Sequence, residues 1–310
     1  MYFIDGHCDT LTTAINKGES LLDHTGHLNL RKLASFRTAV QIFAVWLNEE
    51  QLATPYDTAI QIIEQGSQAF TNNAELIRPA RSYTQVLENI NAGVCSAILG
   101  LEGAEPIGTD MARLHKLHEK GMRVLTLTWN RDNALSGGIT TPNAPGLTNF
   151  GVDVVAECQS LGVIVDVSHI SEKGFWDVAQ ITTKPFFASH SNCKALASHR
   201  RNLDNKQIRA IAGSGGVVGV NFCDAFLSDG YAPDMEDVLR HLEHIINTGG
   251  VESAALGGDL DGIPEPASKW FEDVQIYESI FYRLAQIYGN TVAEKVFFKN
   301  YLRLFKDTLG

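Results

Sequence analysis

Short apolar runs alternate with amphipathic stretches along the whole chain. Eight runs rich in Val, Ile, Leu, Ala or Phe have the length and composition of buried strands, and they cover residues 2–7, 39–47, 96–103, 123–129, 163–169, 185–191, 216–222 and 254–262. Near-continuous apolar runs of this kind are typical of parallel strands that are covered on both faces. The stretches between them have apolar residues at helical spacing, as in 54–70, 109–121 and 235–250, and several end at a glycine just before the next run.

Eight strand–helix alternations predict an α/β fold, a (β/α)8 or TIM barrel, and we expect residues 1–310 to form one barrel domain. Helical patterns at 273–289 and 291–307 follow the eighth run, and these C-terminal helices would close and cover the barrel. A doubly wound open sheet is the alternative fold, but no G-x-G-x-x-G motif follows the first run, which weakens that interpretation.

Residues with functional chemistry gather at the ends of these runs. His7 and Asp9 end the first run, and on a strand they would face the same side while Cys8 faces away. An imidazole and a carboxylate aimed at one point suit a divalent transition metal. Other runs end in Glu102, Trp129, Asn130, His169, His190, Asp259 and Asp261. Because barrel active sites lie at the carboxyl ends of the strands, these residues predict a two-metal hydrolase site on one rim.

Charge and composition exclude several classes of protein. The 25 basic and 36 acidic residues give a net charge of −11, without a basic stripe beyond 199–201, so we expect neither nucleic acid nor a membrane surface as a partner. No apolar run reaches the roughly 18 residues that a membrane span requires. Five scattered cysteines without a C-x-x-C pair indicate free thiols, and no signal-peptide pattern opens the chain, so we expect a cytoplasmic protein.

Eight motifs, in order from residue 4 to about residue 264, resemble the membrane (renal) dipeptidase family of zinc peptidases, family M19, in its bacterial cytoplasmic type. The motifs are DGHCDTL, LGLEGAEP, LTLTWN, VDVSH, ASHSNC, SHRRNLD, GVNF and GGDLDG. The resemblance implies a (β/α)8 barrel with a binuclear zinc centre, two Zn²⁺ per chain. It also makes a homodimer plausible.

The resemblance implies the metal ligands position by position. His7, Asp9 and Glu102 would bind one zinc, and Glu102, His169 and His190 would bind the other. The carboxylate of Glu102 would bridge the two ions and so take part in catalysis. An isolated buried glutamate would otherwise be costly, which favours a metal or another cationic partner at this position.

The resemblance also implies a substrate anchor and a proton carrier. Arg201 matches the arginine that holds the substrate's C-terminal carboxylate, and its planar fork of donors suits a bidentate grip. Asp259 matches the general acid/base. We expect a hydroxide that bridges the two zinc ions to attack the carbonyl of a dipeptide, while Asp259 passes the proton to the leaving amine. Tolerance of a D-residue at the C-terminal position is implied by the family alone.

Two positions depart from the family. Trp129 stands where a histidine often polarises the scissile carbonyl, and Phe226 stands where a substrate-contacting tyrosine is expected. Asn130 is a candidate replacement donor if the strand has ended before it. The departures leave open a related binuclear-zinc amidohydrolase that acts on N-acyl amino acids, lactones or β-lactams. A metal-binding protein without catalysis is a third alternative, which the complete ligand set and Asp259 disfavour.

The remaining polar residues of interest have simpler interpretations. We expect Asp166 to support its neighbours structurally and Asp261 to cap its loop. The histidines at 24 and 27 belong to a lid or to plain surface, and the helical pairs at 115 and 118 and at 241 and 244 are expected on the surface.

Overall fold

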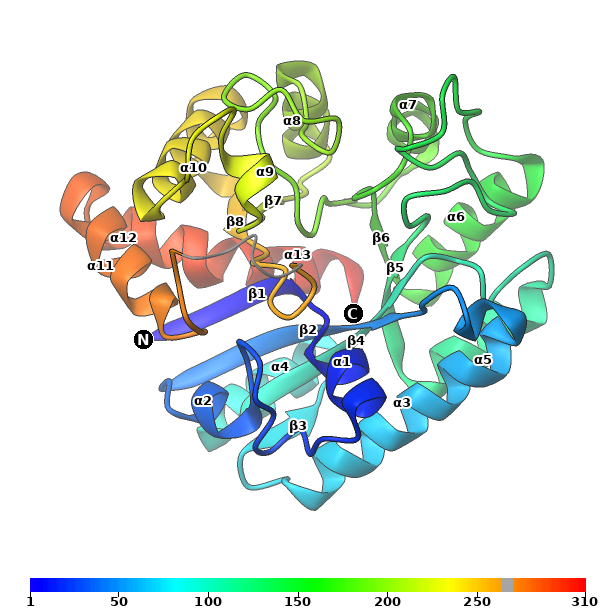
Figure 1. The fold of residues 1–310 in the computed structure, drawn as a ribbon, viewed down its shortest axis with the longest axis horizontal. Coiled ribbons are helices and arrows are strands. Elements are labelled where there is room, and N and C mark those ends of the chain that lie inside the picture. The colour runs from blue at the N-terminus through cyan, green and yellow to red at the C-terminus, as the bar shows by residue number, and fades with distance from the viewer. Residues whose placement is uncertain (264–269) are drawn as a thin grey trace.

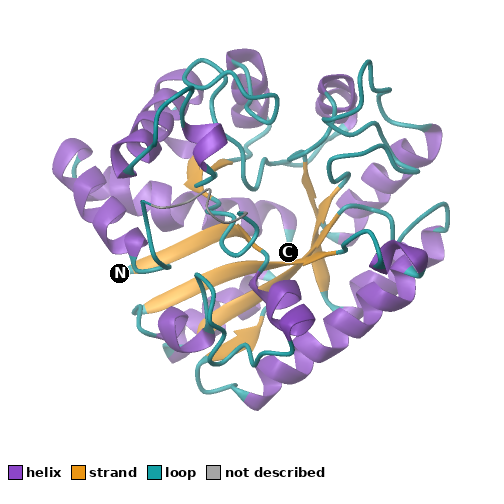
Figure 2. Cartoon of the chain, viewed as in Figure 1, coloured by secondary structure: helices purple, strands orange, loops and turns teal. Residues whose placement is uncertain are grey.

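The computed structural model describes residues 1–263 and 270–310. Its strands form a parallel sheet in the order β6-β5-β4-β2-β1-β8-β7 (Figures 1 and 2). The strands are β1 Tyr2–Cys8, β2 Thr38–Trp46, β3 Ile77–Pro79, β4 Cys95–Glu102, β5 Met122–Thr126, β6 Ile164–Asp166, β7 Val218–Val220 and β8 Ala254–Leu256. Seven of the eight apolar runs thus correspond to strands of this sheet.

The sixth run closes the ring. Val167 N donates to Phe187 O at 2.9 Å, and Ala188 N donates to Val217 O at 3.1 Å, so residues 187–188 bridge β6 and β7. With this segment between them, the eight predicted runs surround one axis, and the prediction of a (β/α)8 barrel is confirmed. β3 was not predicted, because three residues with two exposed side chains carry no strand periodicity.

Helices follow the strands and cover the ring (Figure 2). They are α1 Thr10–Lys17, α2 Leu30–Ala34, α3 Pro55–Asn72, α4 Tyr83–Ala92, α5 Met111–Lys120, α6 Asn149–Leu161, α7 Glu172–Ile181, α8 Asn205–Gly213, α9 Asp224–Leu227, α10 Met235–Gly249, α11 Ile276–Tyr288, α12 Asn290–Glu294 and α13 Asn300–Thr308. The helix expected at 291–307 is divided, because a π-helical stretch at Lys295–Lys299 separates α12 from α13. Short 3-10 turns lie at Gln51–Ala53 and Val251–Ser253.

The C-terminal helix seals the end of the barrel opposite the predicted site. Tyr301 and Phe305 of α13 are fully buried and pack with Ile4, Ile98 and other inward-facing strand residues. The hydroxyl of Tyr301 donates to the carbonyl oxygen of Leu256 in β8 at 3.0 Å. Since this end is filled with side chains, the carboxyl ends of the strands are left to form the functional face.

Candidate metal centre and active site

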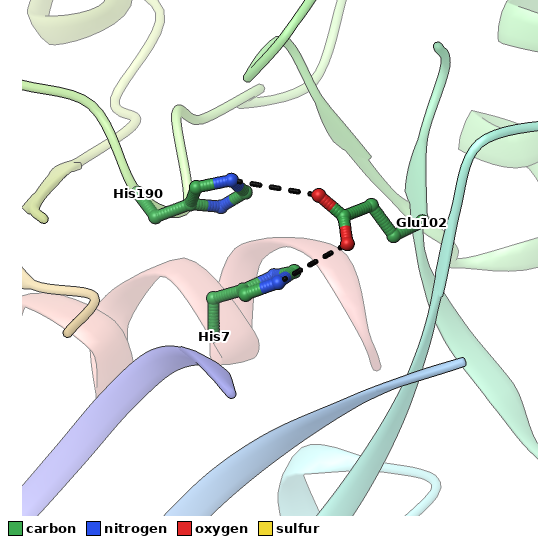
Figure 3. A group of neighbouring side chains, drawn as sticks. All are labelled: His7, Glu102 and His190. Atoms are coloured by element: carbon green, nitrogen blue, oxygen red, sulfur yellow. Dashed lines mark ion pairs between the residues drawn. The ribbon is translucent and has the colours of Figure 1, made fainter. Parts of the chain in front are cut away.

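The carboxyl ends of four barrel segments bring one carboxylate and three imidazoles together. Glu102 ends β4 and lies at the centre of the group (Figure 3). Its Oε2 lies 3.4 Å from Nε2 of His7 in β1, and its Oε1 lies 3.6 Å from Nε2 of His190. Nε2 of His169, which follows β6, lies 3.1 Å from the same Oε1. The structure therefore assembles side chains that are up to 183 positions apart in the sequence (190 − 7).

Two further carboxylates adjoin His7. Nε2 of His7 lies 3.4 Å from Oδ2 of Asp9 and 3.9 Å from Oδ1 of Asp259. Two groups with the spacing of metal ligands share His7: His7 with Glu102 and His190, and His7 with Asp9 and Asp259. Cys8 between the first two ligand candidates is buried in the hydrophobic core, as the alternation along a strand predicts. All six side chains thus line one small volume, in which Asp259 lies beside His7.

Hydrogen bonds behind the histidines fix which ring nitrogen faces the centre. The hydroxyl of Ser189 donates to Oδ2 of Asp166 at 2.6 Å, so it accepts from Nδ1 of His190 at 2.7 Å. The side-chain oxygen of Asn130 can only accept, so Nδ1 of His169 donates to it at 2.9 Å. Protonation at Nδ1 leaves the Nε2 lone pairs of both neutral rings directed into the site.

These lone pairs fit a cation. Nε2 of His169 and Nε2 of His190 are only 2.9 Å apart. Burial, the charge of Arg201 and that of His7 lower the pKa of His169 to about 4. Burial and the charge of His7 lower the pKa of His190 well below its usual value, so neither ring is protonated at neutral pH. Two lone pairs that face each other repel unless a cation lies between or beside them. The donor set of imidazoles and carboxylates is one that zinc and similar divalent metals prefer.

The charges of the remaining ligand candidates agree with this assignment. Burial disfavours the charged form of His7, but the carboxylates of Glu102 and Asp9 outweigh it and raise the pKa of His7 well above its usual value. Burial also opposes ionisation of Glu102, yet His7 and His169 hold its pKa far below the usual range. Oδ1 of Asp9 is buried and lacks a hydrogen-bond partner within residues 1–263 and 270–310. A buried carboxylate cluster that holds a proton on its histidine is a site built for positive charge.

Three residues at or beside the site have an unusual backbone conformation. His169, Asp259 and Asp261 have positive φ angles of 67°, 58° and 65°, a region that non-glycine residues seldom adopt. Such conformations persist where surrounding contacts enforce them, and they gather at functional sites. A Cβ atom on Gly262 would collide with the carboxylates of Asp9 and Asp259, so glycine at this position leaves room for both acids.

Asp5 supports the site, and the sequence analysis did not identify it. This aspartate lies fully buried inside the barrel, where Oδ1 accepts from His7 N at 3.0 Å and from Gln41 Nε2 at 2.7 Å. Its Oδ2 accepts from Gly258 N at 2.7 Å and from the hydroxyl of Tyr277. Asp5 therefore ties β1 to the loop that carries Asp259. The signal was an acidic residue within the otherwise apolar run that opens the chain.

A pocket of about 630 Å³ opens over these side chains. Its walls include the predicted residues Trp129, Asn130, Arg201 and Phe226, together with the ligand candidates Asp9, Glu102, His169 and the proton-carrier candidate Asp259. Trp129 packs edge-on against Trp46 with ring centroids 5.2 Å apart, which makes one wall apolar. Because β5 already ends at Thr126, Asn130 lies in a loop, and its oxygen contacts His169.

Arg201 is the buried cation of this pocket. Its side chain donates from Nη1 to Ser191 Oγ at 3.4 Å and from Nη2 to His190 O at 3.2 Å, and only 5% of the residue is exposed. The guanidinium carbon lies 5.5 Å from the centroid of the Phe226 ring. Phe226 thus contacts the arginine through its ring face, without the hydroxyl that a tyrosine would add. Neighbouring Arg200 is exposed, which separates the roles of the two arginines.

The structure shows the surroundings of the polar residues and cysteines that lie outside the candidate metal centre. Oδ1 of Asp261 accepts from His27 N at 2.6 Å, so Asp261 ties the loop after α1 to the site. His24 is buried and lies 2.6 Å from a carboxylate oxygen of Glu19, so it does not lie on an exposed surface. All five cysteines are buried free thiols.

The expectation that His241 lies on the surface was wrong. The residue is fully buried; its Nδ1 accepts from Cys193 N at 3.0 Å, and its Nε2 donates to Leu227 O at 3.0 Å. Helical spacing placed His241 beside exposed residues of α10, but loops from the rim cover this turn of the helix. His115 is half-exposed on α5 as expected and pairs with Glu157.

We expect His241 to make the fold less stable in acid. Burial lowers its pKa from 6.5 to about 4, so the unfolded chain binds more protons than the folded one between these values. Stability is therefore lost as the pH falls from 6.5 towards 4, by about 3 kcal/mol from this residue. Urea unfolding across this range measures the effect. In a His241→Gln variant the slope should be smaller than in the wild type, and equal slopes would contradict the assignment.

Comparisons with known proteins place the chain among metallopeptidases. The family model described as membrane dipeptidase (peptidase family M19) matches residues 1–309. An uncharacterised protein encoded in the pqqA 5′ region of Klebsiella pneumoniae is 33% identical over 264 residues, which cover 82% of this chain and 97% of that protein. Dipeptidase tcpJ of Claviceps purpurea is 26% identical over 301 residues, covering 92% and 70% of the two chains.

Solved structures agree with these matches. The crystal structure of dipeptidase AC, a metallopeptidase of family M19, superimposes with a TM-score of 0.91 at 29% identity and covers 100% of this chain and 99% of the other. A metallopeptidase from Rhodobacter sphaeroides, bound to a phosphinate mimic of the dipeptide L-Ala-D-Ala, gives a TM-score of 0.90 at 29% identity, with 99% of each chain covered. Among the helices that the structure describes, none is long and apolar enough to cross a membrane.

Proposed function

Since the chain belongs to the membrane dipeptidase family, peptidase family M19, we propose that it is a zinc-dependent dipeptidase with two Zn²⁺ ions per chain. One observation carries the proposal: the Nε2 lone pairs of His169 and His190 meet the carboxylate of Glu102 in the pocket that Arg201 also lines. Such an arrangement combines a place for cations with a place for a substrate carboxylate. The proposed enzyme is a hydrolase acting on peptide bonds, as its structural relatives are.

The proposed ligands divide into two sets. His7, Asp9 and Glu102 would hold one ion, and Glu102, His169 and His190 would hold the other, with the carboxylate of Glu102 shared. When bound, the two ions supply Lewis acidity, which activates water and polarises the scissile carbonyl. The hydrogen bonds that Nδ1 of His190 and Nδ1 of His169 donate to Ser189 and Asn130 serve this function, because they keep both histidines in the tautomer that offers Nε2.

Asp259 is the proposed proton carrier. Its Oδ2 accepts from Asn221 Nδ2 at 2.9 Å, which leaves Oδ1 directed towards His7 and the centre. Burial raises the pKa of Asp259 to about 8, despite the opposing charge of His7, because Asp9 and Glu102 add negative charge. Positive charge held beside it would lower this pKa and leave the carboxylate ionised. Asp259 would then accept a proton from the attacking water and deliver it to the leaving amine.

Arg201 is the proposed anchor for the C-terminal carboxylate. A buried guanidinium in the pocket wall can grip a carboxylate with two parallel hydrogen bonds. This favours dipeptides over longer peptides, because a longer chain places an amide where the carboxylate belongs. The relative bound to a mimic of L-Ala-D-Ala supports a dipeptide with a D-residue at its C-terminal position as a substrate.

Replacing Arg201 by Lys should weaken substrate binding far more than it slows turnover. The lysine keeps the positive charge but lacks the planar guanidinium that can donate two parallel hydrogen bonds to a carboxylate. The loss of one hydrogen bond to a charged group costs about 1.5–3 kcal/mol. We expect kcat/KM to fall roughly 10- to 100-fold, mainly through KM. Steady-state kinetics on L-Ala-D-Ala measure both constants. A dipeptide with an amidated C-terminus serves as the control. It lacks the carboxylate that Arg201 would hold, so its kcat/KM should be similar for wild type and variant. An unchanged KM would remove Arg201 from the anchor role.

Amino-acid release from a dipeptide panel tests the proposed function. The panel contains L-Xaa-L-Xaa and L-Xaa-D-Xaa members and is run with zinc-loaded and with chelated protein. Release that chelation abolishes supports the dipeptidase. Two bound zinc ions without release would favour the second candidate, an amidohydrolase of N-acyl amino acids, lactones or β-lactams. The observation behind this second candidate is the apolar wall of Trp129 and Trp46, which offers no imidazole donor to the carbonyl.

We place the reaction in the cytoplasm. The five cysteines are buried thiols without a disulfide, in agreement with a reducing compartment. A homodimer stays a prediction from the family resemblance.

A further inference from the structure

A second cavity of about 510 Å³ adjoins the proposed active-site pocket. The two cavities share His169, Arg200 and Arg201 in their walls, so a substrate held by Arg201 lies at the border between them. None of the steps proposed above uses this second space. Its remaining walls come from Val167, from the loop at 138–144, from the start of α7, from residues 191–194 and 202–203 and from the start of α8.

The walls of the second cavity are positively charged, although the whole chain carries −11. Four cations line the cavity, Lys173, Lys194, Arg200 and Arg201, against the two acids Glu172 and Asp204. The carboxylate of Asp204 accepts from the backbone N–H groups of residues 206 and 207 at 2.7 and 2.8 Å, so helix capping occupies it. In the part of the chain that the structure describes, Lys173, Lys194 and Arg200 form no ion pair with an acid.

Two further features favour an anion in this space. The N-terminal end of α7, a helix of 10 residues, borders the cavity and adds the positive end of its dipole, whereas the carboxylate of Asp204 already caps α8. Arg201, only 5% exposed, has a buried Nε that lacks a hydrogen-bond partner among residues 1–263 and 270–310. A leftover donor on a buried guanidinium at the border of the two cavities indicates a missing acceptor, and the C-terminal carboxylate that Arg201 is proposed to hold would supply it.

We propose that the second cavity receives the side chain of the substrate's C-terminal residue and selects an acidic one, aspartate or glutamate. The inference rests on the proposed dipeptidase function. In such a residue the side chain branches from the same carbon as the carboxylate that Arg201 holds. A side-chain carboxylate two or three bonds further on therefore enters the cavity next to Arg201, where Lys194 and Arg200 are its unpaired counter-charges.

Isosteric substrate pairs test the charge requirement directly. kcat/KM is measured for zinc-loaded enzyme on Ala-Asp against Ala-Asn and on Ala-Glu against Ala-Gln, each with the L- and the D-form of the second residue. The acidic member should be hydrolysed at least about tenfold better, chiefly through KM, and 0.5 M NaCl should reduce this ratio because salt screens the attraction. Equal hydrolysis of acidic and amide members overturns the subsite but leaves the dipeptidase standing. Failure to hydrolyse any dipeptide overturns both.

Two variants that each remove one positive charge, one inside and one outside the second cavity, test whether the cavity walls cause the preference for an acidic residue. Lys194→Met should reduce the Asp-to-Asn ratio several-fold, and the double change with Arg200→Met should bring it close to one. Lys206→Met is the control, because it removes the same charge from the exposed first turn of α8 outside the cavity walls. An equal loss of the ratio in Lys206→Met and Lys194→Met would show a general charge effect and would overturn the subsite.

Discussion

Replacing Glu102 by Gln is expected to release the bound metal and to lower kcat/KM by roughly a thousandfold or more. The two carboxylate oxygens of Glu102 face different histidines, at 3.4 Å from Nε2 of His7 and 3.1 Å from Nε2 of His169. The neutral amide removes the charge that both proposed ions share. Loss of one partner from a buried charge cluster costs about 3–5 kcal/mol, which corresponds to a factor of about a thousand. Elemental analysis gives the metal content, and dipeptide hydrolysis gives the rate.

Glu157→Gln is the matched control for this change. The residue lies on α6 and pairs with half-exposed His115, so the same substitution there removes one acid far from the rim. We expect its metal content and its rate to equal those of the wild type. A Glu102→Gln variant that keeps two ions per chain at wild-type affinity would contradict the bridging role.

Replacing Asp259 by Asn should separate proton transfer from metal binding. Asparagine keeps the size and can still contact Asn221, but it cannot carry the proton, so we expect kcat to fall by about 10²- to 10⁴-fold. KM and metal content should change little, and the limb of the kcat/KM–pH profile that reports the carboxyl group should disappear. If the variant loses its metal along with its activity, Asp259 acts as a ligand beside His7 and Asp9, a role that its position also allows.

Much of the site could be predicted from the sequence because active sites of (β/α)8 barrels lie at the carboxyl ends of the strands. Once the eight apolar runs are taken as barrel strands, the residues that end them must meet on one rim. His7 and His190 do meet Glu102 there, with their Nε2 atoms 3.4 and 3.6 Å from its carboxylate oxygens. Roles that spacing alone could not give, such as the proposed division of the ligands between two ions, come from the family resemblance and remain predictions.

What the sequence could not supply depends on contacts outside its regular periods. β5 stops at Thr126, so alternation no longer predicts where Trp129 and Asn130 point, and only the structure places Asn130 on His169. Asp5 was hidden because an acid in an apolar run has no distinguishing pattern until its four donors are seen. His241 was misassigned because helical spacing describes one helix and not the loops that cover it.

The most direct test of the central claim is a zinc titration of metal-free protein, followed by the rate of L-Ala-D-Ala hydrolysis. The account predicts no hydrolysis without metal and a rate that rises to a plateau at two Zn²⁺ per chain. Glu102→Gln should remain inactive throughout the same titration. Full hydrolysis by metal-free protein, or a plateau at one ion per chain, would contradict the proposal that His7, Asp9, Glu102, His169 and His190 hold two catalytic ions.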